Sequence, residues 1–123
     1  MRHNDKWVEE RRNQAAQFVR VGNRARNSVR FSSNETRNHA SLKFEVCFRL
    51  AREGKDFITE AIFEHGGRAD ILVLDDHVII ECLESETEIQ ACSKCSSYPS
   101  IFAIEFAKFR KDKSIEKGII RKG

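Results

Sequence analysis

Two carboxylic acids stand at the ends of apolar runs. Asp70 precedes the aliphatic residues 71–74, and Glu81 follows the aliphatic residues 78–80. A carboxylate among apolar residues is unfavourable unless a cation or hydrogen-bond donors accompany it. Two carboxylates that lie close together are typical ligands of the hard divalent ions Mg²⁺ and Mn²⁺. The sequence therefore predicts a Mg²⁺ (or Mn²⁺) site at Asp70 and Glu81.

The spacing of these two acids predicts that they face each other in a strand hairpin. With Asp75 and Asp76 as the two turn residues, counting outward pairs Leu74 with His77 and then Asp70 with Glu81. Facing residues of an antiparallel pair project from the same side, roughly 5 Å apart. Two like charges at that distance repel each other, and a cation between them removes the repulsion. The alternative is a carboxylate pair at an exposed sheet edge.

A helix before the hairpin brings two further polar residues toward it. Residues 34–53 carry apolar side chains at helical spacing, and His39 and Lys43 fall on the same stripe one turn apart. We therefore expect both at the interface between this helix and the sheet, near its N-terminal end. The alternative is structural, with Lys43 extending to solvent and His39 in a core hydrogen bond.

The remaining pattern predicts an α/β fold with an extra N-terminal helix. Capping boxes are expected at Ser32 with Glu35 and at Ser85 with Glu88. The C-terminal residues 107–123 are basic and carry no clear pattern. The expected elements are a helix at 5–20, a basic loop or arm at 21–33, a helix at 34–53, strands at 57–63, 68–74 and 78–83, a helix at 85–97, and a strand at 101–106.

Charge is unevenly distributed along the 123 residues, whose net charge is +3. Both ends are rich in lysine and arginine, whereas the middle is acidic. Basic ends around an acidic centre suit a polyanion held over a metal site, although they also serve solubility alone. The length fits a core domain at 34–123 preceded by a basic helix and arm at 1–33.

The expected redox state of the four cysteines depends on the cellular compartment of the protein. No segment has the length and hydropathy of a membrane span, and no signal peptide is evident, so we expect a cytoplasmic protein with reduced thiols. Cys92 and Cys95 have the spacing of half a zinc site, but a second close pair is missing. Cys47 and Cys82 lie in apolar runs, which indicates small core residues.

The order of elements and the two acids resemble the PD-(D/E)xK nuclease superfamily, which includes restriction endonucleases and archaeal Holliday-junction resolvases. The resemblance covers about residues 34–106 and rests on residues 67–70 (Gly-Arg-Ala-Asp) and 80–83 (Ile-Glu-Cys-Leu). It implies a restriction-endonuclease-like αβββαβ core with a mixed sheet flanked by helices. It also implies that Asp70 and Glu81 bind Mg²⁺, and that a lysine two residues after the glutamate assists catalysis.

This chain has Leu83 at that lysine position. In the superfamily the lysine can come from a neighbouring element, which here implicates Lys94 or Lys43. A closer resemblance is to the branch of competence protein CoiA-like nucleases, with a helical His-x-x-x-Lys, then Arg-x-Asp, then Glu-x-Gln-x-Ser. The chain keeps the first five of these positions and Ser85, and Leu83 replaces the glutamine.

The resemblance implies a metal-dependent endonuclease that acts on nucleic acid, with DNA as the expected substrate, and a homodimer. Further metal ligands would be the Cys82 backbone carbonyl and Glu60. His39, Lys43 and Lys94 would assist catalysis, and Arg68, Arg26 and Arg30 would bind the nucleic-acid backbone. Two alternatives remain open, namely a nuclease-fold protein that binds nucleic acid with weakened catalysis, favoured by Leu83, and a structural or interaction protein with a buried ion network.

Overall fold

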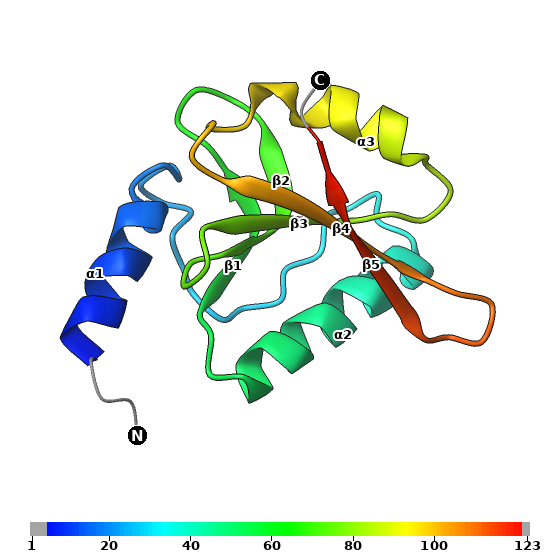
Figure 1. Ribbon diagram of the computed structural model, residues 1–123, viewed down its shortest axis with the longest axis horizontal. Coiled ribbons are helices and arrows are strands. Elements are labelled where there is room, and N and C mark those ends of the chain that lie inside the picture. Colours follow the sequence, from blue (N-terminus) through cyan, green and yellow to red (C-terminus); the bar gives the residue numbers. More distant parts are fainter. Residues whose placement is uncertain (1–4, 122–123) are drawn as a thin grey trace.

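A computed structural model describes residues 5–121 as three α-helices, a short 3-10 helix and a five-stranded sheet (Figure 1). Its α/β class agrees with the prediction from sequence. In chain order the elements are α1 (Asp5–Ala16), α2 (Arg37–Arg52), β1 (Phe57–Ile62), β2 (Arg68–Val73), β3 (Val78–Cys82), α3 (Glu88–Lys94), η1 (Cys95–Ser97), β4 (Ala103–Phe109) and β5 (Ile115–Ile120).

The strands form one mixed sheet in the order β1-β2-β3-β4-β5. Only β3 and β4 are parallel, and the connection between them carries α3 and η1, as a parallel crossover requires. In the β2–β3 hairpin, Ile71 pairs with Ile80 and Val73 with Val78. This confirms the register predicted from the two central turn residues, and its continuation sets Asp70 opposite Glu81.

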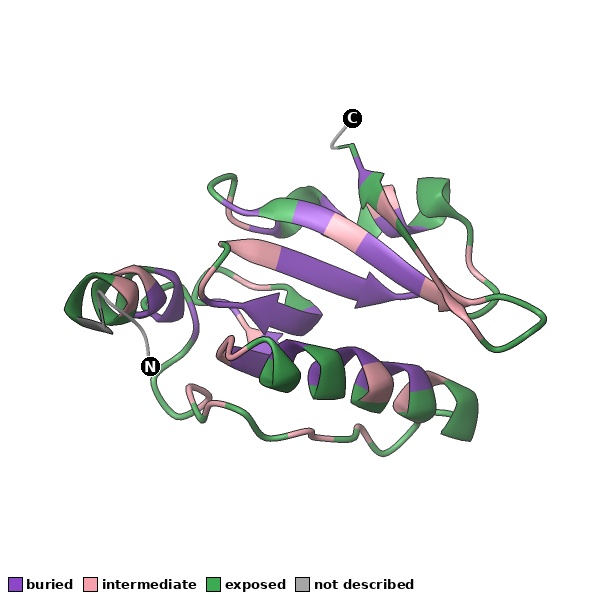
Figure 2. Cartoon of the chain, turned by 60° about the horizontal axis from the view of Figure 1, so that its bottom comes forward, coloured by how far each residue is buried: buried purple, intermediate pink, exposed green. Residues whose placement is uncertain are grey.

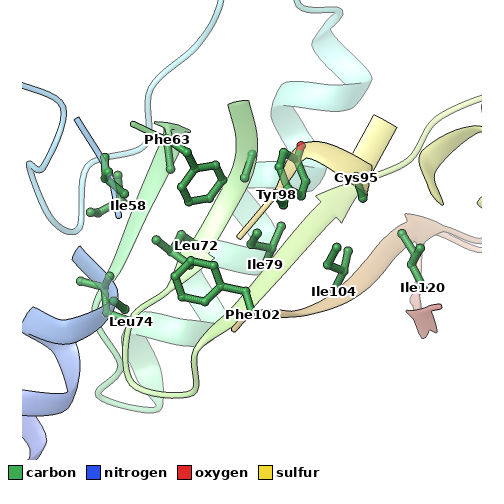
Figure 3. Close-up of a cluster of buried hydrophobic side chains, with 14 of the residues drawn as sticks. Ile58, Phe63, Leu72, Leu74, Ile79, Cys95, Tyr98, Phe102, Ile104 and Ile120 are labelled. Carbon is green, nitrogen blue, oxygen red and sulfur yellow. The ribbon is translucent and has the colours of Figure 1, made fainter. Parts of the chain in front are cut away.

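The sheet buries both of its faces, and Figure 2 shows the buried residues on the strands and on the side of α2 that faces them. We call the two layers the α2-side cluster and the α3-side cluster. The α2-side cluster comprises Leu42, Val46, Cys47, Leu50, Phe57, Ile71, Val73, Ile80, Cys82 and Ala107. The α3-side cluster, shown in part in Figure 3, includes Ile58, Ala61, Phe63, Ala69, Leu72, Leu74, Ile79, Leu83, Cys95, Tyr98, Phe102 and Ile104.

Both predicted capping boxes are wrong in position. Helix α2 begins three residues later than expected, because Thr36 is its N-cap and accepts the His39 amide. Helix α3 is capped by Thr87, which forms a capping box with Gln90, and it is shorter than predicted. In each case several Ser, Thr or acidic residues precede the helix, so the pattern locates the cap only to within one turn.

The C-terminal region differs most from the prediction. Strand β4 begins at Ala103 rather than Ile101 and continues to Phe109, and β5 is a strand that the basic pattern of the tail did not predict. The first helix ends at Ala16 instead of Arg20. The segment after it follows the free edge of β1, where the amide of Asn27 donates to the carbonyl of Phe57. No helix within residues 5–121 is long and apolar enough to cross a membrane.

Candidate functional site

Asp70 and Glu81 bond across the hairpin to each other's strand. The Cys82 amide donates to Asp70 Oδ2 at 2.8 Å, and the Asp70 amide donates to Glu81 Oε2 at 3.2 Å. The exposed fraction is 9% for Asp70 and 1% for Glu81. Main-chain donors thus hold both carboxylates at the point where β2 and β3 stop pairing, since Ile71 and Ile80 form the last pair of the ladder.

The two carboxylates engage partners from opposite layers of the molecule. His39 of α2 has its Nε2 3.4 Å from Asp70 Oδ2. Lys94, at the end of α3, has its Nζ 2.9 Å from Glu81 Oε1, and the Tyr98 hydroxyl oxygen lies 3.3 Å from Glu81 Oε2. The hairpin register alone predicts that the Asp70 and Glu81 side chains project from the same face of the sheet. The structure instead brings the acids together between the two layers, each with a cation from a different helix.

Glu60 explains why Asp70 can face α2. Along β1, Ile58 and Ala61 both lie in the α3-side cluster although they are three positions apart, which regular alternation would place on opposite faces, so the alternation reverses at Glu60. The reversal coincides with a left-handed backbone at Glu60, whose φ is 50°. The adjacent pairs of the register set Glu60 opposite Asp70. A left-handed residue inside a strand costs about 1 to 3 kcal/mol and often marks a functional position.

A chain of ion pairs lies beneath Asp70. Lys43 is fully buried, and its Nζ lies 2.9 Å from Glu35 Oε2 and 3.1 Å from Glu60 Oε2. Glu35 also contacts His39 Nδ1, so that Glu60, Lys43, Glu35, His39 and Asp70 form one continuous network. His39 is thereby oriented with Nδ1 toward Glu35 and Nε2 toward Asp70.

The network sets the charge of each member. The hydrogen bond to Asp70 outweighs burial and raises the pKa of His39 to about 9. Burial raises the pKa of Asp70, but the His39 hydrogen bond and the charge of Lys94 outweigh it, so this pKa is lowered. Burial and the charge of Asp70 raise the pKa of Glu81 in spite of Lys94. His39 and Asp70 are therefore charged at neutral pH, whereas Glu81 holds its proton more tightly than an exposed glutamate.

An open pocket of about 380 Å³ gives access to this cluster. We call it the charged pocket. Asp70 and Lys94 lie in its wall, whereas Glu81 and Lys43 lie behind it. Its lining consists of Ser32, Asn34, Glu35, Thr36, His39, Glu60, Arg68, Asp70, Glu84 and Lys94. A pocket with both carboxylates and cations can accept a phosphate and a divalent ion together.

The structure brings most of the predicted site residues together. Arg68 lines the charged pocket and is 3.6 Å from Glu60 through its Nε. Arg26 and Arg30 do not line it. Arg26 forms ion pairs with Glu9 and Asp56 instead, and the Arg30 amide bonds to Thr59. The Cys82 side chain belongs to the α2-side cluster, so only its main chain reaches the acids.

Two functional candidates were missed from sequence. Glu35 was assigned to a cap, yet its carboxylate binds both Lys43 and His39 while also accepting the Ser32 amide. Tyr98 bonds Glu81 through its hydroxyl, and burial raises the pKa of that hydroxyl. The spacing of Glu35, His39 and Lys43, four residues apart, is the signal that points to the first of these contacts.

The structure contains no ready-made cluster of metal ligands among residues 5–121, since three or more histidine, cysteine, aspartate or glutamate side chains nowhere converge to hold an ion. No disulfide joins the four cysteines, and the Cys92 thiol donates to the Arg121 carbonyl at 2.7 Å. No family model, curated protein or solved structure matches the chain. The site itself must therefore carry any functional argument.

Proposed function

We propose that the protein is a metal-dependent nuclease that hydrolyses phosphodiester bonds of DNA, with Asp70 and Glu81 holding Mg²⁺ or Mn²⁺. One observation carries the proposal: two buried carboxylates meet at the open end of the β2–β3 hairpin, each beside a cation from a different helix. Such clusters with perturbed pKa values concentrate at functional sites. The order of α2, β1–β3, α3 and β4 supports a restriction-endonuclease-like core.

The donor set fits an oxygen-seeking ion. Mg²⁺ is typically held by one or two carboxylates together with water and substrate phosphate, so two protein side chains suffice. Glu60 is a further carboxylate in the wall of the charged pocket, and the Cys82 carbonyl is a main-chain candidate. A bound divalent ion would supply an acidified water molecule and offset negative charge on the phosphate.

The structure separates the two candidate lysines by their surroundings. Lys43 has no exposed side-chain surface and is bonded to two carboxylates, which suits a positioning role. The Lys94 side chain is 48% exposed and lines the charged pocket. We assign Lys94 the role of the lysine missing at Leu83, in which it orients water or stabilises charge on the phosphate. Arg68, also exposed in that wall, would bind the adjacent phosphate.

A second function has an observation of its own. Both carboxylates already have cationic partners in the protein, so the cluster is also complete as an internal ion network. A nuclease fold that binds nucleic acid without cleaving it, or a protein whose network serves only folding, would have the same contacts.

Cleavage assays with matched variants separate these functions. Duplex, single-stranded and branched DNA are incubated with Mg²⁺, Mn²⁺ or EDTA and with the variants Asp70→Asn, Glu81→Gln and Lys94→Ala. Asp112→Asn, which removes an exposed carboxylate from the β4–β5 hairpin, is the control. The proposal expects metal-dependent cleavage in the wild type and in the control only. Binding without cleavage supports the weakened nuclease, and the absence of both supports the structural network.

Calorimetric titration gives a readout that does not depend on turnover. Mn²⁺ should bind the wild type and Asp112→Asn, and should bind Asp70→Asn at least tenfold more weakly. Equal Mn²⁺ binding by all three would refute Asp70 as a ligand.

A further inference from the structure

A second pocket lies on the other side of the β1–β2 turn. It has a volume of about 470 Å³ and takes no part in the ion network. Most of its exposed surface is apolar, and its lining combines the apolar residues Phe18, Phe63, Pro99 and Ile101 with Gln17, Glu64, His65, Gly66, Ser97 and Ser100. We call it the aromatic pocket. Concave sites whose surface is mostly apolar, with a small number of polar groups, are typical of binding sites for organic groups.

The walls of the aromatic pocket are held rigidly by the core. The Phe63 ring is buried and lies 5.4 Å from the ring of Tyr98 and 5.8 Å from that of Phe102, a group that Figure 3 shows. The Phe18 ring meets Phe102 edge-on at 5.4 Å. Ile101, by contrast, is 53% exposed. The pocket therefore combines a fixed aromatic wall with an accessible apolar lip.

The aromatic pocket and the charged pocket are lined by neighbouring residues of the chain. Gly66 lines the first and Arg68 the second, and two residues of chain span at most roughly 7 Å. The Tyr98 hydroxyl fixes this segment by donating to the Arg68 carbonyl at 2.8 Å. Gly67 packs so closely that a Cβ there would lie 3.0 Å from Ser97 Oγ. A polynucleotide with a phosphate beside Arg68 would therefore have an adjacent nucleotide within reach of the aromatic pocket.

We propose that the aromatic pocket binds one unstacked base of the same polynucleotide whose phosphate occupies the charged pocket. This rests on the proposed function and specifies its substrate class as DNA with an unpaired nucleotide next to the reacting phosphate. Bases inside a duplex are stacked and paired, so they cannot enter such a pocket without being extruded. Unpaired bases stack on aromatic side chains regardless of sequence.

The expected substrate is therefore a single strand or a branched structure with a single-stranded arm. The pocket would accept such a base without reading sequence, because unpaired bases stack on aromatic and apolar surface whatever their identity.

Binding measured in EDTA tests this inference separately from cleavage. A labelled single-stranded oligonucleotide is titrated with wild type, Phe18→Ala, Ile101→Ala and the control Phe48→Ala, which truncates an exposed phenylalanine on α2. We expect about a five- to tenfold loss of affinity for the two pocket variants, as for the loss of one stacked base. The control and duplex DNA of the same sequence should show no such loss. Circular dichroism checks that each variant is folded, and Phe18→Tyr should restore binding.

A scan with abasic sites identifies the bound base. Removing the base at one position of the oligonucleotide should weaken wild-type binding as much as Phe18→Ala does. At that position the variant should show no additional loss, because base and side chain then belong to one contact. If the losses of affinity from Phe18→Ala and from the abasic site add at every position, the inference is overturned. It is also overturned if abasic sites have no effect while an apolar peptide competes for the pocket. Duplex cleavage without single-strand binding would overturn the base pocket and leave the nuclease intact.

Discussion

Replacing Lys43 by methionine is the sharpest test of the ion network. Lys43 is fully buried, and its ammonium lies within 3.1 Å of carboxylates from Glu35 and Glu60. Methionine fills a similar volume without charge. It therefore removes the ion pairs while leaving the packing against the α2-side cluster largely intact.

Removing one partner of a buried ion pair costs about 3 to 5 kcal/mol, because the remaining charge stays buried without compensation. The lower end applies here. Glu35 keeps the Ser32 amide and His39, and Glu60 keeps Arg68 at 3.6 Å. We therefore expect Lys43→Met to lower the free energy of unfolding by about 3 kcal/mol.

Urea unfolding followed by circular dichroism measures this loss. The double variant Glu35→Gln/Lys43→Met should be less destabilised than the sum of its single variants, with a coupling of about 1 to 3 kcal/mol. Lys55→Met is the matched control, because Lys55 pairs with Asp76 at the surface and such pairs contribute about 0 to 1 kcal/mol. A Lys43→Met protein within about 0.5 kcal/mol of wild type would refute the reasoning, since surface substitutions alone produce that scatter.

Three further outcomes are expected. Lys94→Ala should reduce metal-dependent cleavage about 100-fold or more, as removal of a charge-stabilising donor does. Burial raises the pKa of Glu35, but Lys43 and other donors lower it below 4.5, so its stabilisation is present above pH 4.5 and is lost as the pH falls through the lowered value. Urea midpoints between pH 6 and 3 should therefore decrease less steeply for Glu35→Gln. Gly118→Ala should cost about 1 to 3 kcal/mol in urea unfolding, because a Cβ would lie 2.3 Å from the buried Phe106 ring.

Each of these has a control within the chain. Lys111→Ala removes an exposed lysine from the β4–β5 hairpin and should leave cleavage unchanged. Glu88→Gln, which removes an exposed carboxylate, should leave the decrease of the urea midpoint between pH 6 and 3 as steep as in the wild type. Gly22→Ala should be nearly neutral, since nothing lies within 4 Å of a Cβ at that position. A cleavage rate for Lys94→Ala equal to that of Lys111→Ala would remove Lys94 from the proposed chemistry.

The parts of the site that sequence predicted are those set by local chain geometry. The position of Asp70 opposite Glu81 follows from a hairpin count with four residues between the first paired positions. The approach of His39 and Lys43 follows from helical periodicity. Both patterns act over distances at which alternation and the helical repeat leave few choices.

The parts that sequence missed depend on tertiary contacts or on departures from those periods. Strict alternation sets Glu60 on the α3 side, and only its left-handed backbone brings it to Lys43. Glu35 has a local role as a turn residue that conceals its role in the network. Strand β5 pairs only with β4, and its apolar residues are interrupted by Glu116, Lys117 and Gly118, so the pattern was too weak to assign.

The arrangement of the two clusters around the sheet explains why an apolar residue occupies position 83. Leu83, one residue past the end of β3, continues its alternation on the side of Glu81 and is buried in the α3-side cluster with 3% exposure. A lysine there would have to extend from the core to reach the charged pocket. Helix α3 packs on that same face of the sheet and brings Lys94 to Glu81. In the proposed nuclease, an ammonium supplied by the helix would replace one supplied by the strand, so that position 83 can be apolar. This exchange requires the α3 crossover to stay closely packed on the sheet, so the capping box at Thr87 that starts the helix also contributes to the placement of the lysine.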